Sequence, residues 1–274
     1  MSADVIDQKS FLALNRENGF FEFNKDQCQQ LGNSLHDQYI NNSPFPHIVI
    51  DNFIDPDILR QVIEQFPERE KGRFSDKFSQ LKTGYSLSQI KSAYIQDLLN
   101  VLNSSNFMIF LSKMTGIKGL TNDPYFLGGG LHETAHGGHL SIHADFNIHP
   151  HTKLLRRINL ILFLNDDWEE EFGGALELWD SGMQACQKSV LPVMARAVIF
   201  NTDSSSYHGH PEPLTCPETR FRRSIALYYY TVSPSLKALP HTTVFKARPG
   251  TGDQRPSFNE RVVQRLKRAF SLRT

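Results

Sequence analysis

Residues 197–231, AVIFNTDSSSYHGHPEPLTCPETRFRRSIALYYYT, place two apolar runs on either side of a segment rich in Ser, Gly and Pro. Apolar and aromatic runs of this length, bounded by turn residues, are typical of β-strands. Runs of the same kind occur upstream, at about 125–134, 139–144, 157–164 and 175–179. Many short strands at this spacing predict a β-sandwich or barrel.

The run RINLILFL (157–164) is separated by an acidic segment, NDDWEEEFGG (165–174), from ALELW (175–179). We expect the two runs to pair as a long hairpin. The acidic segment lacks the alternating D-x-D-x-[DN]-G order of a calcium-binding loop. It is therefore expected to form a solvated hairpin tip.

Helices are predicted mainly in the first 120 residues. Asp55 and Pro56 are suited to the start of a helix that Pro67 ends, and further helices are expected over about 88–102 and 105–115. A strand is expected over 47–53 and a polar loop over 68–86. Together these features predict a mainly β (α+β) chain forming one domain: helical support over 1–120, a β core over 121–233, and an extension with a helix over 234–274.

Composition excludes several classes of protein. The 274 residues carry 29 basic and 29 acidic side chains, so no broad electrostatic attraction to nucleic acid is expected. Cys28, Cys186 and Cys216 are sparse and form no CxxC motif, which is typical of free thiols in a reducing compartment. No secretory leader and no apolar run of about 20 residues is visible. We therefore expect a cytoplasmic protein without a membrane segment, and no oligomeric state is indicated.

The central segment HLSIHADF (139–146) carries a His-x-Asp pair, His143 and Asp145. On a strand, residues i and i+2 project from the same face, so this imidazole and carboxylate are expected to lie together. Four histidines spaced by 4, 3 and 4 from His132 to His143 also suggest a zinc-binding helix. Gly137 and Gly138 interrupt that helix, and no HExxH motif is present. We therefore prefer the strand.

Two further positions complete a candidate iron site. His208 follows a strand and is favoured as the third ligand, with His210 as the alternative. A set of two histidines and one carboxylate leaves three coordination positions open on iron(II). In the strand RRSIALYYY, Arg222 and Ser224 share a face with Ala226 and Tyr228. Arg222 can bind a dicarboxylate through a charge-assisted pair, with Arg223 as the competing anchor.

Five motifs together resemble the prolyl-4-hydroxylase-like branch of the iron(II)/2-oxoglutarate dioxygenases. In chain order they are HADF, RRINLILFLNDDW, FGGALELWD, VIFNTDSSSYHGHPEPL and RRSIALYYYT. The resemblance covers about residues 125–231. It implies a double-stranded β-helix, or jelly roll. It also implies Fe(II) held by His143, Asp145 and His208, and 2-oxoglutarate anchored by Arg222 with Ser224 assisting.

The same resemblance sets the expected activity: hydroxylation of an unactivated C–H of a small molecule, a sugar-linked group or a peptidyl residue. O2 is consumed, succinate and CO2 are formed, and ascorbate is a candidate reductant. Where relatives often carry a Tyr, this chain has Phe163, and Asn159 on the same face is a candidate contact to the cosubstrate. Halogenating relatives lack the carboxylate, so Asp145 favours hydroxylation. The alternatives are an inactive 2-oxoglutarate-binding barrel and a zinc hydrolase.

Overall fold

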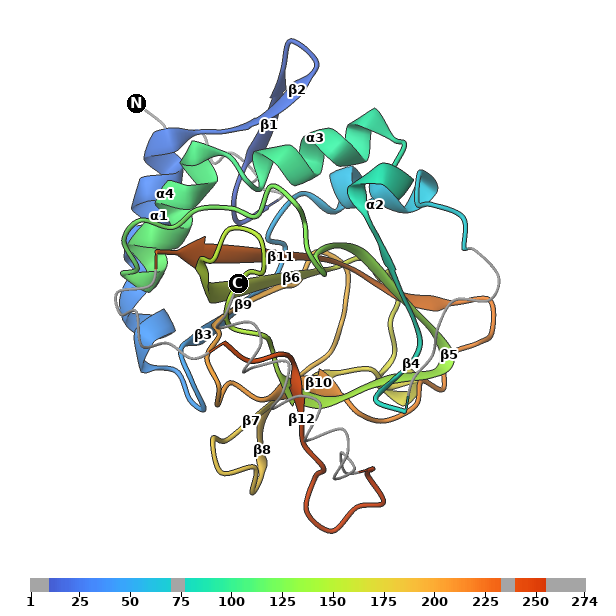
Figure 1. Cartoon of the computed structure of the whole chain (residues 1–274). Coiled ribbons are helices and arrows are strands. Elements are labelled where there is room, and N and C mark those ends of the chain that lie inside the picture. Colours follow the sequence, from blue (N-terminus) through green and yellow to red (C-terminus); the bar gives the residue numbers. More distant parts are fainter. Residues whose placement is uncertain (1–9, 70–76, 233–239, 255–274) are drawn as a thin grey trace, which may run out of the picture.

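The computed structural model describes residues 10–69, 77–232 and 240–254. Among these residues, four α-helices lie in the first half of the chain and most strands in the second (Figure 1). The helices are α1 (Lys25–Asn41), α2 (Pro56–Glu64), α3 (Ala93–Val101) and α4 (Ser105–Thr115), with short 3-10 turns at Leu87–Gln89 and Glu170–Phe172. The predicted C-terminal helix lies outside the described residues.

Ten strands form one antiparallel sheet that curls almost into a barrel (Figure 1). Its main path runs β3-β9-β6-β11-β5-β10-β7-β8, and β4 and β12 pair with the other edge of β5. The strands are β3 (His47–Ile50), β4 (Ser79–Tyr85), β5 (Gly130–Ala144), β6 (Leu155–Phe163), β7 (Leu176–Trp179), β8 (Cys186–Val190), β9 (Ala197–Asn201), β10 (His208–His210), β11 (Phe221–Thr231) and β12 (Val244–Phe245). A separate hairpin joins β1 (Leu14–Glu17) to β2 (Phe20–Phe23).

Strand β5 belongs to both halves of the barrel. Its first part pairs with β11 and its last part with β10. The bend between them lies at two glycines: Gly137 has φ +74°, and a Cβ on Gly138 would lie 2.6 Å from Thr134 Cγ2. Sequence analysis predicted two strands here, whereas the structure has one bent strand. The same glycines exclude the zinc helix, as expected.

The predicted hairpin between 157–164 and 175–179 is wrong. Strand β6 pairs with β9 and β11, whereas β7 pairs with β8 and β10, so the two runs lie in opposite halves of the barrel. Both runs are apolar because side chains from the two halves face each other. Phe163 of β6, Leu176 and Leu178 of β7 and Phe200 of β9 form this inner cluster. The jelly roll expected from the sequence is confirmed.

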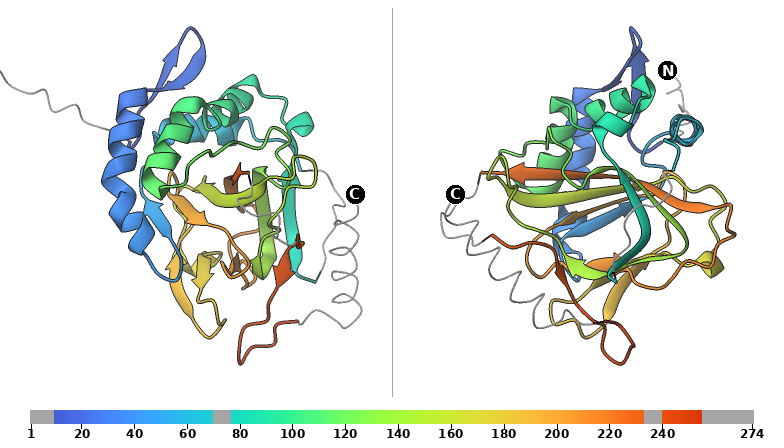
Figure 2. Two further views of the ribbon diagram at one scale, coloured as in Figure 1. Left: turned by 60° about the vertical axis from the view of Figure 1, so that its left-hand side comes forward. Right: turned by 45° about the vertical axis from the view of Figure 1, so that its right-hand side comes forward.

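The helices pack on one side of the barrel and bury the outward-facing side chains of β6, β9 and β11 (Figure 2). Phe107 of α4 is fully buried at the centre of this layer, with ring centroids 5.4 Å from Phe23 and 6.1 Å from Tyr229. Because strand side chains alternate, the other face of β6 and β11 is left to line the barrel interior. Among the described residues, no helix combines the length and the hydropathy needed to span a bilayer.

Helix α4 has the boundaries that the sequence predicted, because both ends are capped. The Ser104 side chain accepts a hydrogen bond from the Phe107 backbone N–H at 3.3 Å, and Gly116 ends the helix with φ +71°. We expect Ser104→Ala to lower the free energy of unfolding by about 1 kcal/mol, as is typical for loss of an N-cap. Urea denaturation measures this effect. The exposed neighbour Ser105 makes no such bond, and equal losses for Ser105→Ala and Ser104→Ala would contradict the assignment.

Candidate functional site

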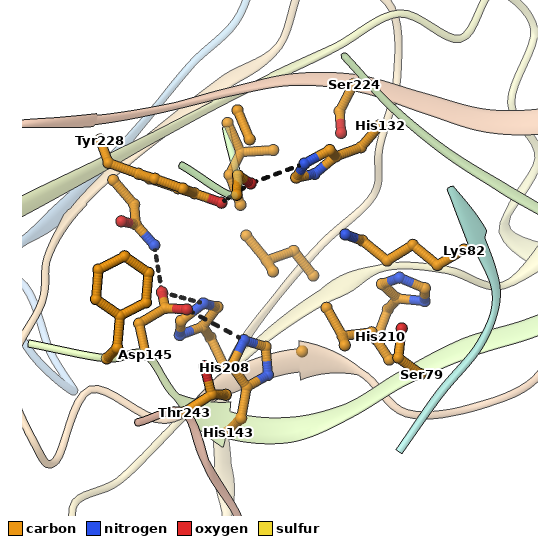
Figure 3. Close-up of a pocket in the computed structure, with 18 of the residues that line it drawn as sticks. Ser79, Lys82, His132, His143, Asp145, His208, His210, Ser224, Tyr228 and Thr243 are labelled. Atoms are coloured by element: carbon orange, nitrogen blue, oxygen red, sulfur yellow. Dashed lines mark hydrogen bonds and ion pairs between the residues drawn. The ribbon is translucent and has the colours of Figure 1, made fainter. Parts of the chain in front are cut away.

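Three side chains from two neighbouring strands converge inside the barrel (Figure 3). His143 lies near the end of β5, Asp145 follows that strand, and His208 begins β10, where its backbone pairs with His143. One ligand atom from each residue lies within 4.8 Å of the other two. The structure thus brings together the three residues that the sequence singled out as metal ligands.

Hydrogen bonds orient both imidazoles in the same way. His143 Nδ1 lies 2.9 Å from the Ser141 carbonyl oxygen, and His208 Nδ1 lies 3.0 Å from that of Ser206. A carbonyl oxygen only accepts, so each Nδ1 carries the proton and each Nε2 presents its lone pair. This is the tautomer that a metal-binding histidine needs, and an N–H bond to a backbone carbonyl is its usual support.

The Asp145 carboxylate is held by two donors on β6. Its Oδ2 atom accepts hydrogen bonds from Arg156 Nη2 at 2.9 Å and from Asn159 Nδ2 at 2.8 Å. Burial alone raises the pKa of Asp145, but Arg156 and the two histidines outweigh burial and hold that pKa well below its usual range. The pKa of His143 is lowered, first by burial and then by the neighbouring His208. A charged carboxylate and a neutral imidazole are the forms that bind metal.

The geometry of the three residues fits a bound divalent ion. His143 Nε2 lies 3.6 Å from Asp145 Oδ1, and His208 Nε2 lies 3.4 Å from Asp145 Oδ2. Both distances are too long for good hydrogen bonds. Two ligand atoms that each lie ~2.1 Å from one ion are separated by roughly 3 to 3.5 Å. The donor set of two imidazoles and one carboxylate is that of non-haem iron(II) sites with three open positions.

A cavity of about 280 Å³ extends from the triad through the barrel interior. Arg222, Ser224, Ala226 and Tyr228 of β11 all line it, so the predicted sharing of one face is confirmed. The Arg222 Nε atom donates to the Gly174 carbonyl at 2.6 Å, and its guanidinium lies 5.0 Å from the centre of the Phe163 ring. Burial lowers the pKa of Arg222 to about 9. No carboxylate pairs with this cation among the described residues.

Arg223 points to the opposite face of β11 and does not line the cavity. Its Nε atom donates to Glu133 Oε2 at 2.9 Å, and Glu133 is only 1% exposed. The Tyr85 hydroxyl and Arg69 also approach this carboxylate. Arg223 thus forms a buried ion pair with Glu133, whereas the Arg222 guanidinium is available to bind an anion in the cavity.

The remaining candidates have distinct positions. Ser224 is buried at the cavity wall, and Asn159 lies beside the triad with both ends of its amide engaged. Its Oδ1 atom accepts from Arg156 Nε at 2.9 Å, and its Nδ2 atom donates to Asp145, so neither end faces an open partner. His210 lines the cavity but does not belong to the metal-binding group. His208, not His210, therefore belongs to the group that could hold a metal ion.

Sequence analysis missed two residues of the site. Arg156 is 2% exposed, and its guanidinium carbon lies 3.4 Å from the centre of the Tyr228 ring. Lys82 was assigned to a polar loop, but it lies on β4 and points into the cavity (Figure 3). Strict alternation along RRINLILFL would place Arg156 on the face opposite Asn159, but a shift in the β6–β11 register between Tyr229 and Tyr230 lets both side chains reach Asp145. The sequence therefore has no signal for either Arg156 or Lys82.

We expect Asn159→Leu to weaken binding of Fe(II) or Mn(II) by roughly 10- to 100-fold, the loss typical when a residue that holds a metal ligand is removed. The physical reason is that Asp145 loses one of its two donors and is less well oriented. Calorimetric titration of the metal measures this. Asn201, whose amide oxygen accepts from the Tyr39 hydroxyl away from the cavity, provides the control Asn201→Ala. Unchanged metal affinity in Asn159→Leu would show that this contact does not matter.

Comparison with known proteins agrees with this geometry. Residues 129–230 match the sequence profile described as 2OG-Fe(II) oxygenase superfamily. The chain is 28% identical over 211 residues to the mouse protein "Prolyl 3-hydroxylase OGFOD1". The matched region covers 73% of this chain and 35% of the mouse protein. The chain thus spans about a third of that relative. The same fold occurs in a Trichoplax adhaerens prolyl hydroxylase, which was solved in complex with a hypoxia inducible factor oxygen degradation domain peptide fragment. The two structures superpose with a TM-score of 0.53 at 18% sequence identity. The superposed region covers 75% of this chain and 91% of the Trichoplax chain.

Proposed function

We propose that this chain, in which residues 129–230 match the 2OG-Fe(II) oxygenase superfamily, is an Fe(II)- and 2-oxoglutarate-dependent hydroxylase whose catalytic site is the cavity at His143, Asp145 and His208. The observation that carries the proposal is the convergence of these three residues, with both Nε2 lone pairs free and the carboxylate charged. In this proposal residues 1–274 act as one catalytic domain.

Each residue of the site has a physical task. His143, Asp145 and His208 would hold the iron, while Arg156 and Asn159 fix the orientation of Asp145. Arg222 would bind the distal carboxylate of 2-oxoglutarate, and Ser224 would offer it a hydroxyl. Ile161 of β6 and Leu176 of β7 give the cavity apolar lining, which limits water around the reacting atoms.

Bound iron(II) and 2-oxoglutarate supply the oxidising chemistry, in which O2 and 2-oxoglutarate convert R–H to R–OH with release of succinate and CO2. The chain positions the reactants and provides the electrostatic environment. Asp145 also supports hydroxylation over halogenation, because its carboxylate takes the coordination position that a halide would need.

The substrate to test first is a prolyl residue within a polypeptide. Support comes from the similarity to the mouse prolyl 3-hydroxylase over 73% of this chain. Residues around a barrel mouth determine specificity, so small-molecule and sugar-linked substrates are tested beside the peptides.

Two measurements test the proposed activity. The iron-loaded full chain is expected to form succinate from 2-oxoglutarate, at a rate that rises when the correct substrate is added. Anaerobic addition of 2-oxoglutarate is expected to produce a visible charge-transfer band. A band without any succinate would instead support a barrel that only binds 2-oxoglutarate. Metal analysis showing zinc, with turnover independent of 2-oxoglutarate, would support a zinc hydrolase.

A further inference from the structure

The cavity contains more positive charge than the triad and Arg222 require. Three of its lining residues are cationic, namely Lys82, Arg156 and Arg222, and one is anionic, Asp145. Arg156 is paired with Asp145 at 2.9 Å. Lys82 and Arg222 therefore remain as two cations without a carboxylate partner in the part of the chain that the structure describes.

Strand register places these two cations on one face. Lys82 of β4 and Arg222 of β11 each pair with Thr134, on opposite sides of β5. Paired residues on neighbouring strands project from the same face, and two strand spacings separate their Cα atoms by ~10 Å. The side chains of Lys82 and Arg222 thus extend into the cavity from either side of Thr134, with room for an anion between them.

His210 provides a second, independent sign of a missing ligand. It is 3% exposed, and neither its Nδ1 nor its Nε2 atom has a hydrogen-bond partner among the described residues. Buried polar side chains are nearly always paired, so such an atom needs an explanation. In Figure 3 the His210 ring lies beside Lys82, across the cavity from Asp145. Lys82 and His210 can therefore donate hydrogen bonds to the same group bound in the cavity.

Burial and the nearby Arg222 lower the pKa of Lys82 to about 8. The charged form of Lys82 is thus destabilised by burial and by a neighbouring like charge. His132 also faces this region, and burial followed by Lys82 holds its pKa well below the usual value. The region therefore favours binding of a negatively charged group.

We propose that Lys82 and His210 form, together with Arg222, a three-sided site for the distal carboxylate of 2-oxoglutarate. This inference rests on the proposed function and adds two residues to the cosubstrate site. Lys82 lies outside the 129–230 segment that matches the superfamily. The cosubstrate would run from the triad toward Arg222, and its distal oxygens would then come within reach of the donors on β4, β10 and β11.

Lys82→Met tests the site by calorimetric titration of the Mn(II)-loaded full chain. We compare 2-oxoglutarate with 2-oxovalerate, which has a methyl group in place of the distal carboxylate. Loss of one charge-assisted bond is expected to raise the Kd for 2-oxoglutarate by roughly tenfold or more and to leave that for 2-oxovalerate unchanged. Lys82→Arg should restore most of the affinity. His210→Leu should weaken 2-oxoglutarate binding selectively as well, by a smaller factor.

Lys188 is exposed on β8, away from the cavity, and Lys188→Met serves as the matched control. Equal 2-oxoglutarate affinity in Lys82→Met and the unmodified chain would overturn the inference alone. Equal weakening of both ligands would also overturn it, because the effect would not depend on the distal carboxylate. If the unmodified Mn(II)-loaded chain bound no 2-oxoglutarate, the proposed function would fail together with the inference.

Discussion

Replacing His143 or Asp145 by alanine is expected to abolish succinate formation from 2-oxoglutarate. We expect the rate to fall by at least about a hundredfold. Removing a residue that only supports a metal ligand typically costs 10–100-fold, and removing a ligand itself should cost more. Each substitution removes one of three protein ligands. Metal content and succinate are measured on the same iron-loaded samples.

The control for this prediction lies on the same strand. His136 of β5 hydrogen-bonds through Nδ1 with the Cys216 carbonyl oxygen at 2.6 Å and does not line the cavity. His136→Ala should therefore retain metal and turnover. Asp145→Ala also leaves buried Arg156 without its carboxylate, so thermal unfolding is followed to separate loss of metal from loss of fold. Full turnover in His143→Ala would refute the site assignment.

Arg222→Met and Arg223→Met are expected to have opposite effects. Arg222→Met should raise the Kd for 2-oxoglutarate by roughly 10- to 100-fold, since a charge-assisted hydrogen bond contributes about 1.5–3 kcal/mol. Its stability should be unchanged or higher, because an unpaired buried cation is removed. Arg223→Met should leave 2-oxoglutarate affinity unchanged.

The expected cost of Arg223→Met is in folding. It leaves the Glu133 carboxylate, 1% exposed, without its 2.9 Å partner. Breaking a buried pair typically costs 3–5 kcal/mol, and we expect about 3 kcal/mol because Arg69 still lies 3.6 Å from Glu133. Urea denaturation and calorimetry on both variants separate the two effects. Loss of 2-oxoglutarate affinity in Arg223→Met, with Arg222→Met unaffected, would reverse the assignment.

Local rules in the sequence predicted several features correctly. The two-residue period of a strand placed Arg222, Ser224, Ala226 and Tyr228 on one face, and all four line the cavity. Two glycines excluded a helix at 137–138, and the helix predicted over 105–115 matches α4. These features depend on neighbours a few residues away, where backbone geometry and capping decide the outcome.

Which strands pair was decided only by the tertiary structure. An apolar strand can join any partner that buries it, so two adjacent runs looked like a hairpin although β6 and β7 lie in opposite halves of the barrel. Likewise, β4 appeared as a polar loop because one face carries Lys82 into the cavity and much of the rest is exposed. A polar strand gives no apolar alternation for sequence analysis to detect.

The fold class and the grouping of His143 with Asp145 followed from the sequence, because residues two apart on a strand project from the same face. His208 was chosen from its place after a strand, and the structure brings it to the same group. The surroundings of these three residues depend on the tertiary structure. It placed Arg156 and Asn159 against Asp145, paired Arg223 with Glu133, and brought Lys82 to the same cavity as Arg222. These pairs join residues 11 to 140 positions apart, from Asp145 and Arg156 to Lys82 and Arg222. The most distant of them meet only when the sheet closes around the cavity, and no local rule specifies that closure.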